Sequence, residues 1–162
     1  MAVSYGGYQA GGINILNQTT EEFDRIFRTN VYAGFFVSRA AVPRMPPGSN
    51  IIFTASMAAQ QPHSASMSYT ASKAAVVNFS QGLAGQLGDF GIRVNAVLPA
   101  LTYTPFLATI GFSMELLEQF TPTFPLGRLV QPVEVALLYV NFADPLNSYA
   151  SGSWATTPGG NE

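Results

Sequence analysis

A tyrosine and a lysine spaced four residues apart, Tyr69 and Lys73, are the side chains of this sequence best suited to acid–base chemistry. On a helix this spacing places both side chains on one face. Because an ammonium group favours the phenolate beside it, we expect Lys73 to lower the pKa of Tyr69 toward neutral pH. Tyr69 would then serve as a general acid or base.

A serine, Ser56, follows a short apolar run, Asn50 to Ala55, that is typical of a buried strand. Ligands of open parallel sheets gather at the carboxyl ends of the strands, so Ser56 could hold a substrate carbonyl or hydroxyl beside Tyr69. A Tyr-x-x-x-Lys pair alone is a common pattern, and the alternative is an exposed helix pair. Lys73 is the only lysine in the chain, which argues against a solvated lysine face.

The elements that must position these side chains alternate along the chain. Hydrophobic spacing, Pro and Gly signals and short apolar runs predict helix, strand, helix, strand, helix and strand over residues 20–42, 50–56, 68–87, 91–98, 132–142 and 153–157. Residues 1–12 are expected to form a flexible loop or tail. Residues 13–162 would be one domain, with an excursion at 100–127 that holds one short helix at 114–120. Alternating helices and strands predict an α/β fold with a parallel sheet.

The composition excludes several classes of partner. Hydrophobic residues make up 48% of the chain, charged residues only 10%, the mean hydropathy is +0.20 and the net charge is −2. We therefore predict a folded protein that self-associates as a homodimer or higher homo-oligomer. No basic patch suits nucleic acid, and no apolar run is long enough to span a membrane. Cysteine is absent, so we expect no metal site and a cytoplasmic protein.

Several short stretches of the chain can be compared with known families. They are Thr29-Asn30-Val31 with Gly34-Phe35-Phe36, Asn50 to Ser56, Tyr69-Thr70-Ala71-Ser72-Lys73-Ala74-Ala75, Gly91 to Val97 with Pro99, Pro125 to Arg128 with Gln131-Pro132 and Glu134-Val135-Ala136, and Gly152 to Gly160. Taken together, these stretches resemble the short-chain dehydrogenase/reductase family over residues 13–160. The resemblance covers the second half of that family's Rossmann-like, doubly wound sheet.

The resemblance implies a role for each matching residue. Tyr69 would be the catalytic acid or base, Lys73 would lower its pKa and bind the nicotinamide ribose, and Ser56 would orient the substrate carbonyl. Asn30 would hold a water molecule that links Lys73 to solvent. Tyr69 and Lys73 would also contact the cofactor, NAD(P), if one binds.

The family's dinucleotide-binding half, with its Gly-rich turn and helix, has no counterpart in this sequence. The glycine pairs Gly6-Gly7 and Gly11-Gly12 are expected not to bind phosphate, because no strand is predicted before them and no apolar helix follows closely. The family motif Asn-Asn-Ala-Gly has only a faint counterpart in Tyr8-Gln9-Ala10-Gly11. The usual Pro-Gly is Pro99-Ala100 here, and Pro158 replaces the usual Asp. Without the missing half, one edge of the strand at 51–55 needs cover from residues 1–17 or from a second chain.

The excursion at 101–124 is rich in apolar and aromatic residues. It would either line a pocket for a hydrophobic substrate or pack into a small core of its own. The single histidine, His63, is expected to be exposed and not catalytic. The single tryptophan, Trp154, is expected in the core or at an interface.

Three functions remain open from the sequence. The first is an oxidoreductase acting on a carbonyl or hydroxyl of a hydrophobic small molecule, with NAD(P) as cofactor. The second is a non-redox isomerase, dehydratase or cyclase that uses Ser56, Tyr69 and Lys73 with no cofactor, since proton transfer needs no hydride donor. The third is a non-catalytic fragment or binding subunit.

Overall fold

The fold is built around a parallel sheet of four strands. The structure, a computed structural model, describes residues 1–10 and 14–160. The strands are β1 (Ala2–Ser4), β2 (Asn50–Thr54), β3 (Arg93–Leu98) and β4 (Trp154–Thr156), and they lie side by side in that order. All neighbouring strands run parallel. This arrangement confirms the predicted α/β fold.

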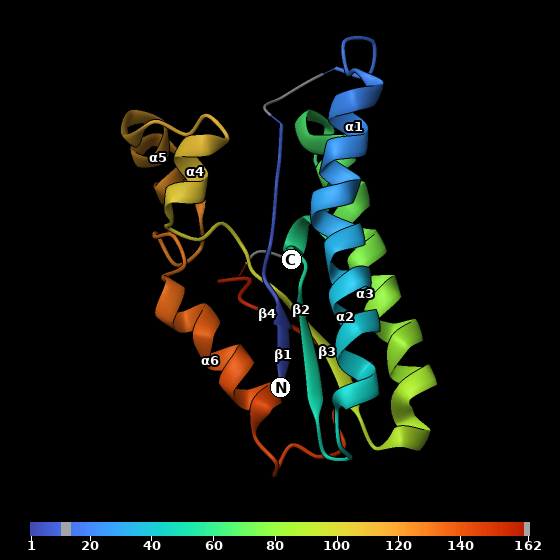
Figure 1. Ribbon diagram of the computed structural model, residues 1–162. Coiled ribbons are helices and arrows are strands. Elements are labelled where there is room, and N and C mark those ends of the chain that lie inside the picture. The colour runs from blue at the N-terminus through green and yellow to red at the C-terminus, as the bar shows by residue number, and fades with distance from the viewer. Residues whose placement is uncertain (11–13, 161–162) are drawn as a thin grey trace.

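Helices cover both faces of the sheet (Figure 1). One face carries α1 (Thr20–Phe27), α2 (Ala33–Ala41) and α3 (Met67–Leu87), and the other carries α6 (Pro132–Ala143). Two short helices, α4 (Pro105–Thr109) and α5 (Met114–Phe120), lie beyond the carboxyl ends of the strands. The short helix predicted at 114–120 is therefore present with the same bounds.

The core lies on both sides of β2 and β3, because these central strands are buried on both faces. Ile51 and Phe53 pack with Val76 and Leu87 of α3, whereas Ile52 faces the opposite way. On that second side Ile52 and Val97 pack against Val135 and Phe142 of α6. Continuous apolar strands of this kind are typical of parallel sheets between two helical layers.

The N-terminal strand β1 corrects the prediction that residues 1–12 form a loop or tail. Val3 pairs with Ile52 and Ser4 with Phe53, so β1 covers the edge of β2. The sheet thus has four strands, not the predicted three, and a strand precedes Gly6-Gly7. Three residues are too few to show a period, and only the neighbouring strand makes them a β-strand. Gly11 and Gly12 lie outside the described residues.

The helix predicted over 20–42 begins as expected but is not uniform. Thr19 caps α1 in a capping box with Glu22, at 3.1 and 3.4 Å for the two hydrogen bonds. A turn of π-helix, Arg28–Tyr32, separates α1 from α2. Single π turns of this kind are often found at functional sites. This one places Asn30 on the inner side of the helix, where it is buried.

The excursion between β3 and α6 forms a small hydrophobic core of its own. Leu107, Leu117 and Leu129 are buried together, and Ile110 and Phe112 pack against them. Of the two alternatives for this segment, the structure therefore supports a self-packed lid. Its apolar side chains are mostly used within the lid, and Phe106 is the one whose ring lies near Tyr69.

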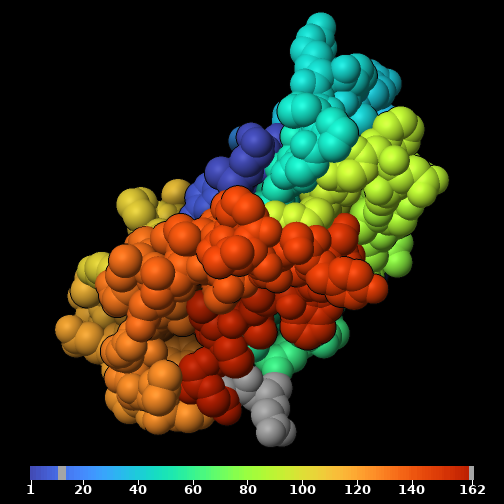
Figure 2. Space-filling view, turned by 90° about the horizontal axis from the view of Figure 1, so that it is seen from below, coloured from blue at the N-terminus to red at the C-terminus, as the bar shows by residue number. Residues whose placement is uncertain are grey.

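The outer side of α6 is apolar and exposed. Seen from below, α6 and the chain after it (orange to red) form a large part of the surface beside the N-terminal strand (blue) (Figure 2). Val133, Leu137 and Val140 are exposed there, while Val135 on the same helix is buried. Trp154 is 40% exposed on the edge strand β4, so of the two positions expected for it, core or interface, the core is excluded. None of the helices in residues 1–10 and 14–160 is both long and apolar enough to span a membrane.

Candidate active site

Lys73 lies at the carboxyl ends of two neighbouring strands. Its Nζ atom donates to the main-chain oxygen of Thr54 at 3.0 Å and to that of Gly6 at 3.4 Å. Thr54 ends β2, and Gly6 follows β1 by two residues. The ammonium group also lies 5.7 Å from the ring centroid of Tyr69, one helical turn earlier on α3. The predicted Tyr–Lys pair is therefore on one face of a helix, and that face is directed at the sheet.

Burial dominates the electrostatics of Lys73. The residue is only 2% exposed, and desolvation lowers its pKa to about 8. The two ion pairs found among the described residues are elsewhere, between Arg28 and Asp24 and between Arg128 and Glu134. Main-chain carbonyl oxygens, not a carboxylate, therefore partner the ammonium group.

Tyr69 is half-buried near the start of α3. The pKa of its phenol differs from the prediction. Burial raises the pKa of Tyr69, and a hydrogen bond with the Ser56 side chain offsets part of that rise. We predicted that Lys73 would lower this pKa, which is wrong for the arrangement seen here. The reason is that the Lys73 ammonium is directed at the two carbonyl oxygens, so desolvation of the phenol is the larger effect.

Ser56 is held where the β2 strand runs into a loop. Its main chain is extended, and its Oγ atom accepts a hydrogen bond from the amide of Ala58 at 3.2 Å, at the start of a short 3-10 turn. The residues on both sides are tied to the neighbouring strand, since Ala55 donates to Val97 and Met57 donates to Pro99. Ser56 therefore has a fixed position beside Tyr69, as predicted from the end of an apolar strand.

Asn30 is 5% exposed and joins three parts of the site. Its Oδ1 atom accepts from the Tyr8 amide at 2.7 Å, and its Nδ2 atom donates to the Tyr8 carbonyl at 3.0 Å. The same nitrogen donates to Ser72 Oγ at 2.9 Å. Ser72 directly precedes Lys73. Asn30 thus faces the site and not solvent, but its side chain bonds to the N-terminal segment and to α3, with no hydrogen bond to Lys73 among the described residues.

The N-terminal segment, residues 5–10, is the part of the site that we did not predict. Gly6 accepts from Lys73, Tyr8 is paired with Asn30, and the Arg25 guanidinium lies 4.3 Å from the Tyr8 ring centroid. A Cβ atom on Gly7 would lie 3.6 Å from Lys73 Nζ. The glycine pair after Ala2-Val3 was the available signal, but the apolar run before it is too short to indicate a strand.

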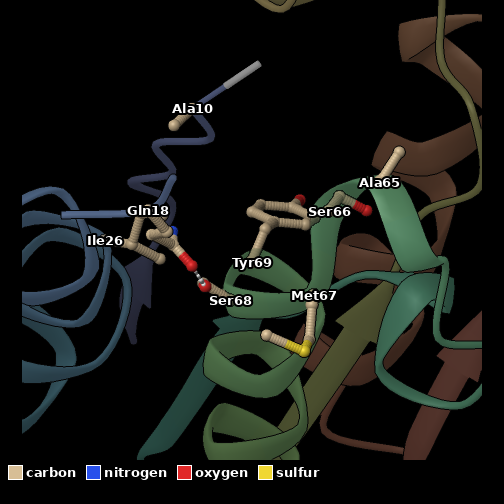
Figure 3. Close-up of a pocket in the computed structure, with 8 residues that line it drawn as sticks. All are labelled: Ala10, Gln18, Ile26, Ala65, Ser66, Met67, Ser68 and Tyr69. Atoms are coloured by element: carbon tan, nitrogen blue, oxygen red, sulfur yellow. Dashed lines mark hydrogen bonds between the residues drawn. The ribbon is translucent and has the colours of Figure 1, made fainter. Parts of the chain in front are cut away.

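A shallow pocket lies beside Tyr69 (Figure 3). The Tyr69 ring stands between the N-terminal segment at Ala10 and the turn at Ala65 and Ser66. A hydrogen bond from Ser68 Oγ to Gln18 Oε1 links the start of α3 to the chain before α1. Its free space holds one water molecule at most, so the pocket gives solvent access to the side of the ring. It is lined by Ala10, Gln18, Ile26, Ala65, Ser66, Met67, Ser68 and Tyr69.

The remaining predicted positions have structural roles. His63 is exposed as predicted, and its Nδ1 atom accepts from the Ala65 amide at 3.3 Å. Ala100, which stands where the family usually has Gly, donates its amide to Thr157 Oγ1 at 3.3 Å. Thr156 Oγ1, close by on β4, is buried without a hydrogen-bond partner. No cluster of three or more His, Cys, Asp or Glu side chains suited to a metal ion occurs in the described part of the chain.

A parallel sheet between helices carries a serine, a tyrosine and a buried lysine at its carboxyl edge, the arrangement that the family resemblance of the sequence implies. A family model described as "Enoyl-(Acyl carrier protein) reductase" matches residues 1–161. The chain belongs to the short-chain dehydrogenase/reductase family.

The curated relatives are oxidoreductases by name. "Uncharacterized oxidoreductase YghA" of Escherichia coli is 38% identical over 145 residues, which are 90% of this chain and 49% of that protein. "Glucose and ribitol dehydrogenase homolog 2" of Arabidopsis thaliana is 43% identical over 138 residues, 85% of this chain and 47% of that protein. This chain therefore spans about half the length of the curated relatives it matches.

Solved structures show the same fold. A 3-ketoacyl-(acyl-carrier-protein) reductase from Brucella melitensis, complexed with NADH, has a TM-score of 0.88 and 29% identity. The likeness covers 98% of this chain and 65% of that one. The fold described here thus corresponds to about two thirds of that structure.

Proposed function

We propose that this chain supplies the acid–base residues of an NAD(P)-dependent oxidoreductase that acts on a carbonyl or hydroxyl group. The observation that supports this best is the placement of Lys73. A lysine buried at the ends of two strands, one turn from a half-buried tyrosine, has little value for folding, because burying an ammonium group costs free energy. Buried ionisable groups with perturbed pKa values gather at functional sites, which supports a chemical role for Lys73.

Each residue has one task in the proposed reaction. The Tyr69 hydroxyl donates a proton to the carbonyl oxygen in reduction and accepts it in oxidation. Ser56 donates a hydrogen bond to the same oxygen and orients it. Lys73, whose pKa is about 8, is readily charged and discharged near neutral pH and supports proton exchange with Tyr69. Asn30 holds the N-terminal segment and α3 together beside Lys73 through its hydrogen bonds to Tyr8 and Ser72. It is also proposed to take part in the proton path to solvent.

The residues present fit one end of a nicotinamide dinucleotide. Lys73 and Tyr69 would hold the ribose next to the nicotinamide, since the Lys73 ammonium lies at the strand ends beside the Tyr69 ring. When bound, the cofactor supplies or accepts the hydride. The pyrophosphate end is different, because the first helix after Gly6-Gly7 begins only at Thr20. The pyrophosphate would therefore be held without the helix N-terminus that usually follows a glycine-rich turn.

Nucleotide titration with a lysine variant tests the cofactor. Calorimetry with NADH and NADPH should show binding by the chain, weakened at least about tenfold in Lys73→Met, because a contact to the ribose is lost. Arg44→Met, at an exposed position, is the control and should bind as the parent does. Absence of binding at millimolar nucleotide would refute the proposed cofactor.

Turnover tests the acid–base residue. Oxidation of NADPH with a panel of hydrophobic aldehydes should fall by about 100-fold or more in Tyr69→Phe, since general acid catalysis contributes that much. Tyr149→Phe makes the same chemical change at a fully exposed tyrosine and should leave turnover unchanged. Equal rates in the two variants would exclude Tyr69 as the acid.

We propose a hydrophobic substrate because of the ring of Phe106. It lies 6.5 Å from the Tyr69 ring, tilted by 36°, and comes from α4 of the lid. It would pack against the apolar part of a substrate whose carbonyl oxygen meets Tyr69. Phe106→Ala should raise KM for aromatic aldehydes more than for acetaldehyde, and an equal change for both would argue against this contact.

We also propose that the outer surface of α1 and α2 is a dimer interface. Five large apolar side chains are exposed on this helical segment: Phe23, Tyr32, Phe35, Phe36 and Val37. Exposed patches of this kind are rare on monomers. Light scattering should give a dimer mass that falls to a monomer mass in Phe36→Glu. Phe120→Glu, on α5, should leave the mass unchanged, and a parent chain that is monomeric would contradict the interface.

A further inference from the structure

Tyr139 on α6 contacts Thr54 at the end of β2, the residue whose carbonyl oxygen also accepts from Lys73. Its hydroxyl oxygen lies 2.6 Å from Thr54 Oγ1, a hydrogen-bond distance. Its ring lies 6.1 Å from the ring of Tyr5, tilted by 54°. Tyr139 therefore contacts the chain at the end of β2 and the chain just after β1.

Lys73 contacts these same two segments from the opposite face of the sheet. Its two acceptors are the main-chain oxygen of Thr54 and that of Gly6, the residue after Tyr5. Thr54 is therefore held twice, by its hydroxyl on the α6 side and by its carbonyl on the α3 side. Tyr139 is in place to fix both carbonyl groups that receive the ammonium.

The Lys73 ammonium depends on the position of these carbonyls. Ion pairs among the described residues lie elsewhere, so the two oxygens are the acceptors seen for this buried charge. The other titratable groups nearby are the tyrosines, Tyr69 on its own helix and Tyr5 and Tyr139 behind the strands. Burial raises the pKa of Tyr139 to about 12, so it stays protonated while Lys73 titrates.

We propose that Tyr139 is a positioning residue for Lys73, acting through the Thr54 hydroxyl and the Tyr5–Gly6 segment. Its contacts are with Thr54 and Tyr5, so it would act on Lys73 through these residues. Its hydrogen bond to Thr54 holds the Thr54 carbonyl oxygen, and its ring contact with Tyr5 holds the segment of the Gly6 carbonyl oxygen, at positions that stabilise the ammonium form. The role of Lys73 in catalysis rests on the proposed function, but its positioning by Tyr139 is tested without nucleotide or substrate.

The single lysine makes the test direct. In protein labelled with [13Cε]lysine, one NMR signal reports the titration of Lys73, which begins from a pKa of about 8. Tyr139→Phe keeps the ring but removes the hydroxyl, so the carbonyls are held less well and the charged form loses stabilisation. The midpoint should fall by roughly half a pH unit, a threefold loss of proton affinity. Tyr149→Phe, fully exposed, is the control and should not move the midpoint.

Variants of Thr54 separate this role from a general loss of packing. Thr54→Val removes the hydroxyl and should lower the midpoint as Tyr139→Phe does, whereas Thr54→Ser keeps a hydroxyl and should restore it. The double variant Tyr139→Phe/Thr54→Val should match either single variant, because both act through one hydrogen bond. If Tyr139→Phe does not fold, the Val and Ser variants decide the question. An unchanged Lys73 midpoint in the folded Tyr139→Phe or Thr54→Val protein would overturn the proposal.

Discussion

Lys73 Nζ donates to the main-chain oxygen of Thr54 at 3.0 Å, and this bond joins two elements 19 residues apart. The same lysine lies above the Tyr69 ring but is directed past it toward the strand ends. The spacing of Tyr69 and Lys73 placed them on one helix face. The carbonyl oxygens at the strand ends are the atoms that the ammonium meets. Burial, and not an ion pair between the two side chains, therefore sets the pKa values of Lys73 and Tyr69.

The depressed pKa of Lys73 predicts a pH dependence of stability. The pKa is about 8 in the fold, against an ordinary value of 10.5, so between these values the unfolded chain binds the proton more tightly. Stability therefore rises with pH above 8, by about 1 to 2 kcal/mol up to pH 9.5. Above pH 10 the raised pKa values of Tyr69 and Tyr139 act in the opposite direction. Urea unfolding from pH 7 to 9.5 should show the rise, and Lys73→Met should remove it.

Asn30 should contribute to stability far more than an ordinary helical asparagine. Asn30→Ala removes three hydrogen bonds and leaves the Tyr8 main chain with unsatisfied groups. The expected loss is about 2 to 3 kcal/mol in the free energy of unfolding. Asn78→Ala, at an exposed position of α3, is the matched control and should change it by less than about 0.5 kcal/mol. Similar values for the two variants, measured in urea, would show that the Asn30 contacts are dispensable.

Two helical glycines should respond in opposite directions to the same change. A Cβ atom on Gly34 of α2 would lie 2.9 Å from the Phe53 ring, so Gly34→Ala should destabilise the fold by about 1 to 3 kcal/mol. At Gly82 of α3 no atom lies within 4 Å of the added methyl. Gly82→Ala should therefore stabilise by about 0.5 to 1 kcal/mol, because alanine favours a helix. Thermal unfolding should give a lower midpoint for Gly34→Ala and a higher one for Gly82→Ala than for the parent. Shifts of the same sign would contradict the difference in packing at the two glycines.

The short strand β1 should protect the sheet from aggregation. Deleting residues 2–4 uncovers the edge of β2, whose residues Ile51 and Ile52 are almost fully buried. Exposed apolar edges pair with other chains, so light scattering on warming should begin at a lower temperature. Val3→Thr keeps a β-branched residue at a 40% exposed position and is the control. If scattering by the deletion variant begins at no lower temperature than scattering by Val3→Thr, β1 does not have this protective role.

Most of the long elements could be predicted from local patterns. The α6 helix begins at the predicted Pro132, and the apolar runs at β2 and β3 have the predicted places. These signals are strong because burial repeats over many residues. The β1 strand has three residues and the π turn at Arg28–Tyr32 has five, and neither leaves a comparable pattern. Both depend on neighbours distant in sequence.

The sequence by itself determined which groups could do chemistry, since the Tyr69–Lys73 spacing, the single lysine and a serine after an apolar strand are local facts. Only the tertiary structure decided their environment. It brought the Gly6 carbonyl to Lys73 from 67 residues away and turned Asn30 toward Tyr8. It also buried Tyr69 enough that its pKa rises. The physical reason is that desolvation and hydrogen bonding depend on which segments meet in space, whereas residue type and spacing do not.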